Sequence, residues 1–230
     1  MSPMWATISF VAKQEASGKR RVGCAVQDEA NDARGKRGVL LLVPGVTRRT
    51  PIRAGIIRPM DYQIRHMSEE EWPLLEEFLY EAIYVPDDFE GEIPRGVIYD
   101  DPKCRAAFEG FGSLPDDRAV VTVADGKVVG ACWVRTTDEY GHIDDETPSF
   151  SISLYKPYRG RGIGTAMMKA LLDELRKAGY VRVSLSVQKE NPAFRLYERL
   201  GFRIVGDGFD ATEWLMVKVL ADRGPESRSR

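Results

Sequence analysis

The sequence predicts an α/β protein with a mixed, largely antiparallel sheet of about six or seven strands and about four helices around it. Several short segments alternate apolar and polar residues between turn signals, which is typical of half-buried strands. Other segments carry apolar residues at helical spacing between capping residues. The composition agrees with this class, because 43% hydrophobic and 30% charged residues over 230 positions are usual for a globular domain.

The first regular elements follow Pro59. Residues 62–66 alternate like a short strand, and Ser68 with Glu71 forms a capping box that starts a helix. The inward face of that helix is predicted from apolar residues at helical spacing: Trp72, Leu75, Phe78, Leu79, Ala82 and Ile83. Asp101 and Pro102 predict a second short helix, which runs to the glycines at 110 and 112.

The remaining elements alternate in type along the chain. Strands at 119–124 and 128–135 flank the turn Asp125-Gly126, which predicts a hairpin. A strand at 150–155 leads into a glycine-rich loop, and the apolar-faced helix after it ends at Gly179. A strand at 181–187, a short helix after Asn191-Pro192 and two final strands at 202–205 and 213–219 follow.

The charge distribution divides the chain near Pro59. Residues 1–58 hold eleven Lys and Arg against four Asp and Glu, whereas the rest holds 22 against 31. We therefore predict a folded domain at 59–222, a polar tail at 223–230, and a basic extension at 1–58 that is disordered or not part of the folded unit. An over-extended gene start and a nucleic-acid-binding arm are the alternatives for this extension, and the acidic domain argues against the second.

Several classes of protein are excluded by composition. Three distant cysteines and two histidines provide neither a disulfide framework nor a metal-ligand cluster, so we expect no metal and a reducing, cytoplasmic compartment. No apolar run approaches the roughly 18 residues of a membrane-spanning helix, so no membrane partner is expected. The sequence is compatible with a homodimer.

The glycine-rich loop carries the strongest chemical signal. Glycines before a helix let an anion approach the free backbone amides at the helix start, and Arg159 and Arg161 add positive charge there. A P-loop would need G-K-[ST], but Thr165-Ala166 follows Gly164, and Thr165 also breaks the dinucleotide pattern G-x-G-x-x-G. The pattern present is R-x-x-G-x-G over 159–164.

A second motif lies about thirty residues downstream, at 191–202, and reads N-P-A-F-R-L-Y-E-R-L-G-F. Together the two motifs, with a helix and a strand between them, resemble the GNAT superfamily of acyl-CoA-dependent N-acyltransferases. The resemblance covers roughly residues 62–220 and leaves the basic extension outside it.

The resemblance implies a donor site for acetyl-CoA. Its pantetheine arm would bind the open edge of a strand that splays from the strand at 183–187, and Asn191 would reach the same arm. A backbone amide on that edge would stabilise the oxyanion, and Tyr197 would protonate the departing thiolate. The residues expected to bind the donor, beside Asn191, are Ile152, Ser153, Leu154, Arg159, Gly160, Arg161, Gly162, Ile163, Gly164 and Thr165.

One departure from the superfamily concerns the base that deprotonates the acceptor. Some members carry a glutamate five residues before the asparagine, where this chain has Ser186. Two alternatives could deprotonate the acceptor. One is a water relay held by Ser184 or Ser186, and the other is an acid of the 144–146 cluster, among which Glu146 ranks first. The favoured interpretation of those acids is a solvated loop that attracts cationic substrates.

The resemblance thus predicts an N-acetyltransferase that moves an acetyl group from acetyl-CoA to a primary amine by direct attack in a ternary complex. No covalent intermediate is expected, since no cysteine or serine is paired with a histidine in the sequence pattern. The alternative is a non-catalytic module that senses acyl-CoA, which would need the glycine loop but not Tyr197.

Overall fold

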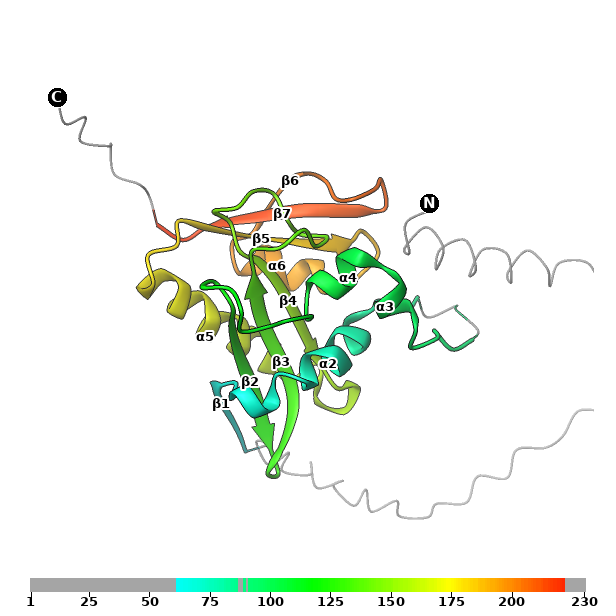
Figure 1. The fold of residues 1–230 in the computed structure, drawn as a ribbon, viewed down its shortest axis with the longest axis vertical. Coiled ribbons are helices and arrows are strands. Elements are labelled where there is room, and N and C mark those ends of the chain that lie inside the picture. The colour runs from blue at the N-terminus through cyan, green and yellow to red at the C-terminus, as the bar shows by residue number, and fades with distance from the viewer. Residues whose placement is uncertain (1–60, 87–88, 90, 222–230) are drawn as a thin grey trace, which may run out of the picture.

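The computed structural model describes residues 61–86, 89 and 91–221. Within these ranges the chain forms one seven-stranded sheet in the order β1-β2-β3-β4-β5-β7-β6 (Figure 1). The β4–β5 pair is parallel and the other neighbours are antiparallel. The strands are β1 (Tyr62–His66), β2 (Arg118–Ala124), β3 (Lys127–Arg135), β4 (Ser149–Leu154), β5 (Arg182–Gln188), β6 (Arg203–Asp207) and β7 (Glu213–Val219).

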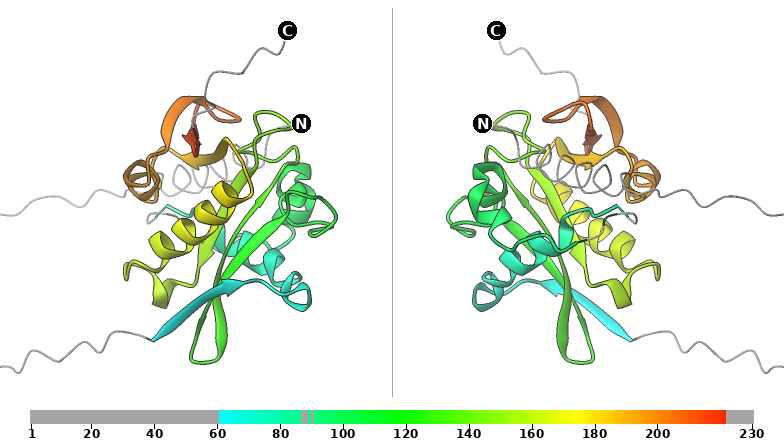
Figure 2. Two further views of the ribbon diagram at one scale, coloured as in Figure 1. Left: turned by 90° about the vertical axis from the view of Figure 1, so that its left-hand side faces the viewer. Right: turned by 90° about the vertical axis from the view of Figure 1, so that its right-hand side faces the viewer.

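Helices cover both faces of the sheet. The longest, α5 (Ile163–Lys177), packs on one face of β1–β4, and α2 (Leu74–Ala82) packs on the other face of β3 and β4 (Figure 2). The shorter helices are α3 (Val97–Asp100), α4 (Pro102–Ala106) and α6 (Phe194–Arg199), and the 3₁₀ turns are η1 (Glu69–Glu71) and η2 (Lys156–Tyr158).

Strand alternation sends side chains into two separate cores. Val120 and Cys132 face α5, where they meet the buried apolar face of that helix, whereas Val121 and Trp133 on the same strands face Phe78 of α2. The buried residues of α5 are Ile163, Met167, Met168, Leu171, Leu172 and Leu175, the set that helical spacing predicts. The sheet is therefore a buried middle layer.

The predicted α/β class and the largely antiparallel mixed sheet are confirmed. The capping box of Ser68 and Glu71 is present, and the Asp125-Gly126 turn has positive φ at both residues, as its hairpin requires. The basic extension at 1–58 and the tail at 223–230 lie outside the described residues, so the predicted domain boundaries stay predictions.

The helices differ from expectation in two places. The described residues contain five α-helices rather than four, because α3 is a single turn, too short to show a periodic pattern. The helix that starts at Asp101 and Pro102 ends at Ala106 instead of reaching the glycines at 110 and 112. At its end the carbonyl of Ala106 accepts hydrogen bonds from Thr137 and Arg135.

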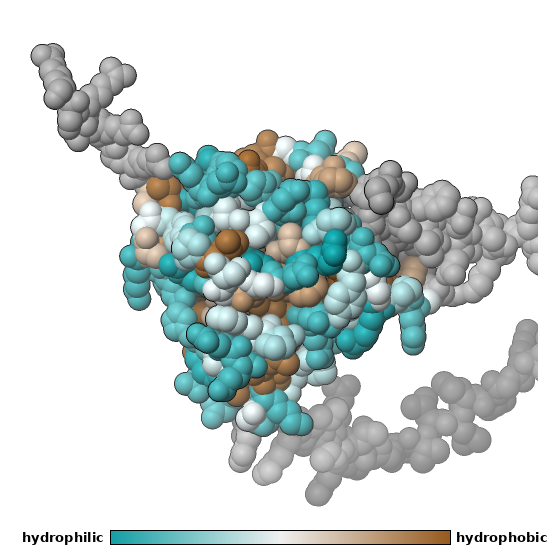
Figure 3. Space-filling view, in the orientation of Figure 1, coloured by the Kyte–Doolittle hydropathy of each residue, from teal (hydrophilic) through white to brown (hydrophobic). Residues whose placement is uncertain are grey.

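The face of the molecule seen in Figure 3 is largely hydrophilic, with hydrophobic residues in small patches. On the edge strand β6, Ile204 and Val205 are exposed. Across the described ranges, no helix is both long and apolar enough to span a bilayer.

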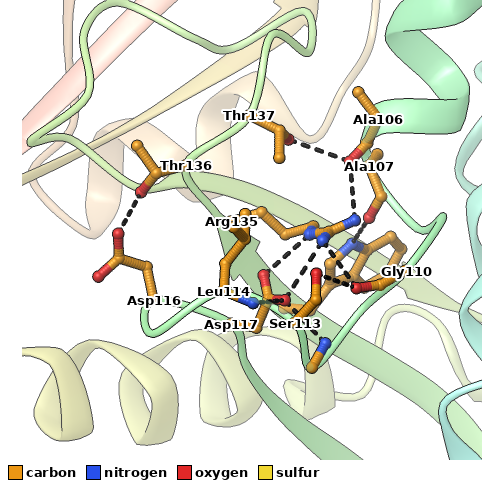
Figure 4. Close-up of polar contacts among 12 residues, drawn as sticks. Ala106, Ala107, Gly110, Ser113, Leu114, Asp116, Asp117, Arg135, Thr136 and Thr137 are labelled. Atoms are coloured by element: carbon orange, nitrogen blue, oxygen red, sulfur yellow. Dashed lines mark hydrogen bonds and ion pairs between the residues drawn. The ribbon is translucent and has the colours of Figure 1, made fainter.

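A buried ion pair holds α4 and the segment after it against the sheet (Figure 4). Arg135, at the end of β3 and only 2% exposed, donates Nε to Oδ1 of Asp117 at 2.8 Å. Its remaining nitrogens donate to the carbonyls of Ala106, Glu109 and Gly110 at 2.6–3.2 Å. Every guanidinium nitrogen is thus used, which is the condition under which a buried charge is stable.

Arg135→Met should lower the free energy of unfolding by about 3–5 kcal/mol, because Asp117 would be left buried without its counter-charge. Urea unfolding monitored by tryptophan fluorescence measures this. Arg176→Met is the control, since Arg176 pairs with Asp173 on the exposed face of α5, and it should cost about 1 kcal/mol or less. Equal losses in the two variants would contradict the structural role given to Arg135.

Candidate active site

Strands β4 and β5 start together and then diverge. In the described residues they pair at one position, Ser149 with Ser184, next to a hydrogen bond from the Ser184 amide to the Pro148 carbonyl at 3.0 Å. Beyond that point the two strands have no common ladder. The divergence opens a gap in the middle of the sheet.

The edge of β4 toward this gap carries free backbone groups. The amide of Tyr155 donates to the Val129 carbonyl on β3, so the alternation of the strand turns the groups of Phe150, Ile152 and Leu154 toward the gap. The carbonyl of Leu154 accepts from Nε of Arg159 at 2.6 Å. Since the Ser149–Ser184 bridge occupies the Phe150 amide, an extended ligand could pair with the β4 edge beyond it, around Ile152, as an added strand would.

The glycine-rich loop lies just past the end of β4. Gly160 and Gly162 have φ of +73° and +82°, and a Cβ at either position would meet no other atom within 4 Å. Gly162 is the N-cap of α5, so the amides of Ile163, Gly164 and Thr165 belong to the first helical turn and lack intrahelical acceptors. This open backbone at the positive end of a helix dipole suits an anion.

A pocket passes through the gap between β4 and β5. From the α2 and α4 side it is lined by Leu79, Ala82, Ile83, Lys103, Cys104, Ala107, Glu139, Tyr140 and Gly141. From the two strands, α6 and the neighbouring β7 it is lined by Ser149, Phe150, Ser151, Ile152, Ser186, Val187, Gln188, Asn191, Tyr197 and Glu213. The opening between the splayed strands therefore connects the two faces of the sheet.

Tyr197, on α6, lines the pocket and is 8% exposed. Its ring packs edge-on against Phe202, with centroids 6.1 Å apart. Burial raises the pKa of its phenol above the ordinary value of 10, so the hydroxyl is protonated at neutral pH. A protonated phenol in this place can donate a proton.

Two buried carboxyl groups line the same pocket. Glu139, in the loop between β3 and β4, is 5% exposed, and burial raises its pKa to about 7, against a smaller opposing effect of the Ser149 hydroxyl. Glu213, at the start of β7, is 3% exposed, and its Oε2 accepts a hydrogen bond from Oγ of Ser186 at 2.6 Å. Burial also raises the pKa of Glu213.

Aromatic and ionic contacts close the α4 side of the pocket. Tyr140 donates its hydroxyl to Oδ2 of Asp101 at 2.6 Å and packs edge-on against Phe209, with centroids 5.5 Å apart. Lys103 lies over the Phe209 ring and pairs with Asp138 at 2.5 Å. The loops before β4 and before β7 thus meet over Glu139 and Glu213.

A family model described as the acetyltransferase (GNAT) family matches residues 68–202. The chain belongs to the GNAT family. This confirms the resemblance drawn from the glycine loop and the Asn191 motif, at the level of the family.

Individual relatives match over shorter stretches. A mycothiol acetyltransferase of Corynebacterium glutamicum is 33% identical over 90 residues, which cover 38% of this chain and 29% of that protein. The ribosomal protein bS18-alanine N-acetyltransferase of Escherichia coli is 41% identical over 59 residues, 25% of this chain and 40% of that protein. The chain thus spans less than half the length of either relative.

Solved structures support the fold. The ribosomal-protein-S18-alanine N-acetyltransferase from Escherichia coli superposes with a TM-score of 0.50 at 18% identity, covering 72% of this chain and 98% of that one. PaiA N-acetyltransferase from Thermoplasma acidophilum, solved in complex with coenzyme A, gives 0.50 at 21% identity, covering 70% and 99%.

In this GNAT chain the structure brings some of the predicted site residues together and not others. Ile152, Asn191 and Tyr197 line one pocket, and the open glycine backbone lies at the far end of β4. Asn191 also caps its own turn, accepting from the Ala193 amide at 2.9 Å. The Arg159 guanidinium lies on α2 instead of the loop, donating to the Glu81 carboxylate at 2.9 Å.

Glu146 is exposed and does not line the pocket, so its predicted role as a base gains no support from its position. Its neighbour Asp144 pairs with Arg182 at the start of β5. The sequence analysis missed Glu139 and Glu213, which do line the pocket. Glu139 lies in the same acidic loop, and no local signal separates it from its exposed neighbours, because its burial comes from contacts distant in sequence.

Glu139 should make the protein less stable as the pH rises. The folded pKa of about 7 exceeds the ordinary 4.5, so the folded state binds the proton more tightly, and the stability present below pH 4.5 is lost as the pH rises through 7. Glu139→Gln stays neutral and should exceed the wild type by about 1–3 kcal/mol at pH 8, but not at pH 4.5. Urea unfolding across this range tests it, with the exposed Glu70→Gln as control; parallel curves for Glu139→Gln and wild type would contradict it.

Proposed function

We propose that this chain is an N-acetyltransferase that transfers an acetyl group from acetyl-CoA to a primary amine by direct attack in a ternary complex. The observation that carries the proposal is the gap between β4 and β5, with an open glycine loop at one end and the pocket of Tyr197 through its middle. Membership of the GNAT family supports it.

The donor would lie along the gap. Backbone amides between Gly160 and Thr165 would bind the pyrophosphate, with Arg161 exposed beside them. The pantetheine arm would pair with the free edge of β4 around Ile152, within reach of Asn191, which lines the same pocket. The coenzyme A bound to PaiA N-acetyltransferase, a chain of similar fold, supports this class of donor.

The chemistry would be stepwise at the thioester carbon. A free amine attacks this carbon, and the oxyanion that develops there would be stabilised by a backbone amide on the open edge of β4, since preorganised donors act strongly in a pocket with little water. Tyr197 would protonate the departing thiolate, for which its protonated state at neutral pH is suitable.

Direct attack is favoured over a covalent enzyme intermediate by the two cysteines that lie among the described residues. Cys104 and Cys132 are buried, and burial raises the pKa of both thiols. A thiolate is the nucleophilic form of cysteine, so both thiols are inert at neutral pH.

Tyr197→Phe should lower kcat by roughly 10²- to 10⁴-fold and leave the Kd for acetyl-CoA unchanged, because the ring still packs while the proton donor is lost. Thiol release from acetyl-CoA measures it, with a panel of a polyamine, an amino acid, an aminoglycoside and a peptide that begins with alanine. Tight acetyl-CoA binding without turnover of any amine would reject the enzyme in favour of an acyl-CoA sensor.

Gly162→Ala should weaken coenzyme A binding about tenfold or more, because a methyl group enters the open backbone that would hold the pyrophosphate. Gly179→Ala is a matched control at the other end of α5: its φ is +86° and its surroundings are equally open. Both variants should lose about 1 kcal/mol of stability from the same backbone strain. Calorimetry with coenzyme A separates them, and equal affinities would place the pyrophosphate elsewhere.

A further inference from the structure

The pocket holds two carboxyl groups that the predicted chemistry does not yet use. Glu139 projects from the loop between β3 and β4, and its Oε1 is buried without a hydrogen-bond partner among the described residues. Glu213 enters the same pocket from β7. A buried, unpaired carboxyl oxygen that lines a pocket is costly for the fold, which points to a ligand that would pair with it.

Glycines hold both carboxyl groups close to β5. A Cβ at Gly141 would lie 3.0 Å from Cα of Leu185, so the loop of Glu139 packs directly on the β5 backbone. A Cβ at Gly208 would lie 2.7 Å from Cβ of Glu213 and 2.9 Å from Oγ of Ser186. The close packing of both loops therefore depends on residues without side chains.

The surroundings of the two groups differ. Glu213 accepts hydrogen bonds from the Ser186 hydroxyl and the Phe209 backbone, and both favour its charged form. Burial is the largest effect on both groups and raises the pKa of each, but among hydrogen-bond donors Glu139 has only the Ser149 hydroxyl to oppose it and keeps Oε1 unpaired, and its pKa of about 7 matches that of a base at neutral pH. Two carboxyl groups in unlike surroundings divide naturally into an anchor and a proton acceptor.

We propose, on the basis of the N-acetyltransferase function proposed above, that Glu139 takes the proton from the acceptor ammonium and that Glu213, held by Ser186, binds this ammonium across the pocket. Ser186 occupies the position where some GNAT members carry a glutamate. In this chain the carboxylate beside that position comes from the adjacent strand, 27 residues further along.

The other charged and titratable groups near Glu139 leave it available. Arg135 and Lys103 lower its pKa and Asp117 raises it, but Arg135 is bound to Asp117 and Lys103 to Asp138. The further titratable groups of the pocket are Cys104, Tyr140, Tyr197 and Glu213. Among these neighbours no unpaired positive side chain would repel a cation that binds between Glu139 and Glu213. The site therefore suits an acceptor that carries an ammonium group and no anionic group next to it.

The protons balance as follows. The ammonium gives one proton to the Glu139 carboxylate, the free amine forms the C–N bond to give the tetrahedral oxyanion, and the C–S bond breaks when this intermediate collapses. Tyr197 protonates the thiolate, and the second proton of the attacking nitrogen restores the phenol. One proton leaves per turnover, through Glu139 to solvent.

The test is the pH dependence of kcat/KM with the best amine of the panel. The wild-type kcat/KM should reach half its maximum near pH 7 and a plateau above it. The kcat/KM of Glu139→Gln should be about 100-fold lower at pH 7 and should rise about tenfold per pH unit toward the pKa of the amine, because this variant relies on free amine from solution. Glu213→Gln should raise KM for the amine at least tenfold and keep the wild-type pH profile. Both variants should keep the wild-type Kd for acetyl-CoA, and Glu70→Gln is the unaffected control.

Formate added to Glu139→Ala provides an independent readout, since it should restore part of the rate by replacing the lost carboxylate. A wild-type pH profile of kcat/KM in Glu139→Gln, or a loss of kcat/KM in Glu146→Gln instead, would overturn this inference. The proposed function would still stand in that case, because the wild type turns over. Absence of wild-type turnover with every amine would overturn the proposed function and this inference together.

Discussion

The parting of β4 from β5 is the constraint on which the site depends. The two parallel strands are joined at Ser149 and Ser184 and then separate. The β4 backbone around Ile152 is therefore left without a neighbouring strand on that side. Such groups are satisfied in a folded protein by a partner, and an extended ligand can provide it. The same parting connects the two faces of the sheet, so under the proposed function a donor and an acceptor would enter from opposite sides and meet.

Packing on both faces holds the half of the sheet from β1 to β4, and the core under α5 extends to Val183 and Leu185 of β5. The apolar face of α5 spans β1–β4 on one side, and α2 covers β3 and β4 on the other. Arg159 joins the end of β4 to Glu81 of α2. Arg135 binds the carbonyls that follow α4, which brings Lys103 and Cys104 to the wall of the pocket.

The site carries a cost in stability that its function would explain. Glu139 is buried with one oxygen unpaired, and Glu213 is buried with a raised pKa. Natural selection for stability alone would replace a buried carboxyl with an apolar residue of similar size. Their presence in one pocket beside Tyr197 fits the proton transfers of the proposed function.

The sequence by itself determined the local elements and the glycine loop, because capping residues, turns and apolar spacing act within a few residues of one another. It also identified Asn191 and Tyr197 through a contiguous motif. Tertiary structure alone decided which acids are buried, since the buried Glu139 and an exposed acid of the same loop, Glu146, look alike in sequence. It also paired Ser186 with Glu213 and turned Arg159 toward α2, because these contacts depend on strand order and helix packing rather than on neighbouring residues.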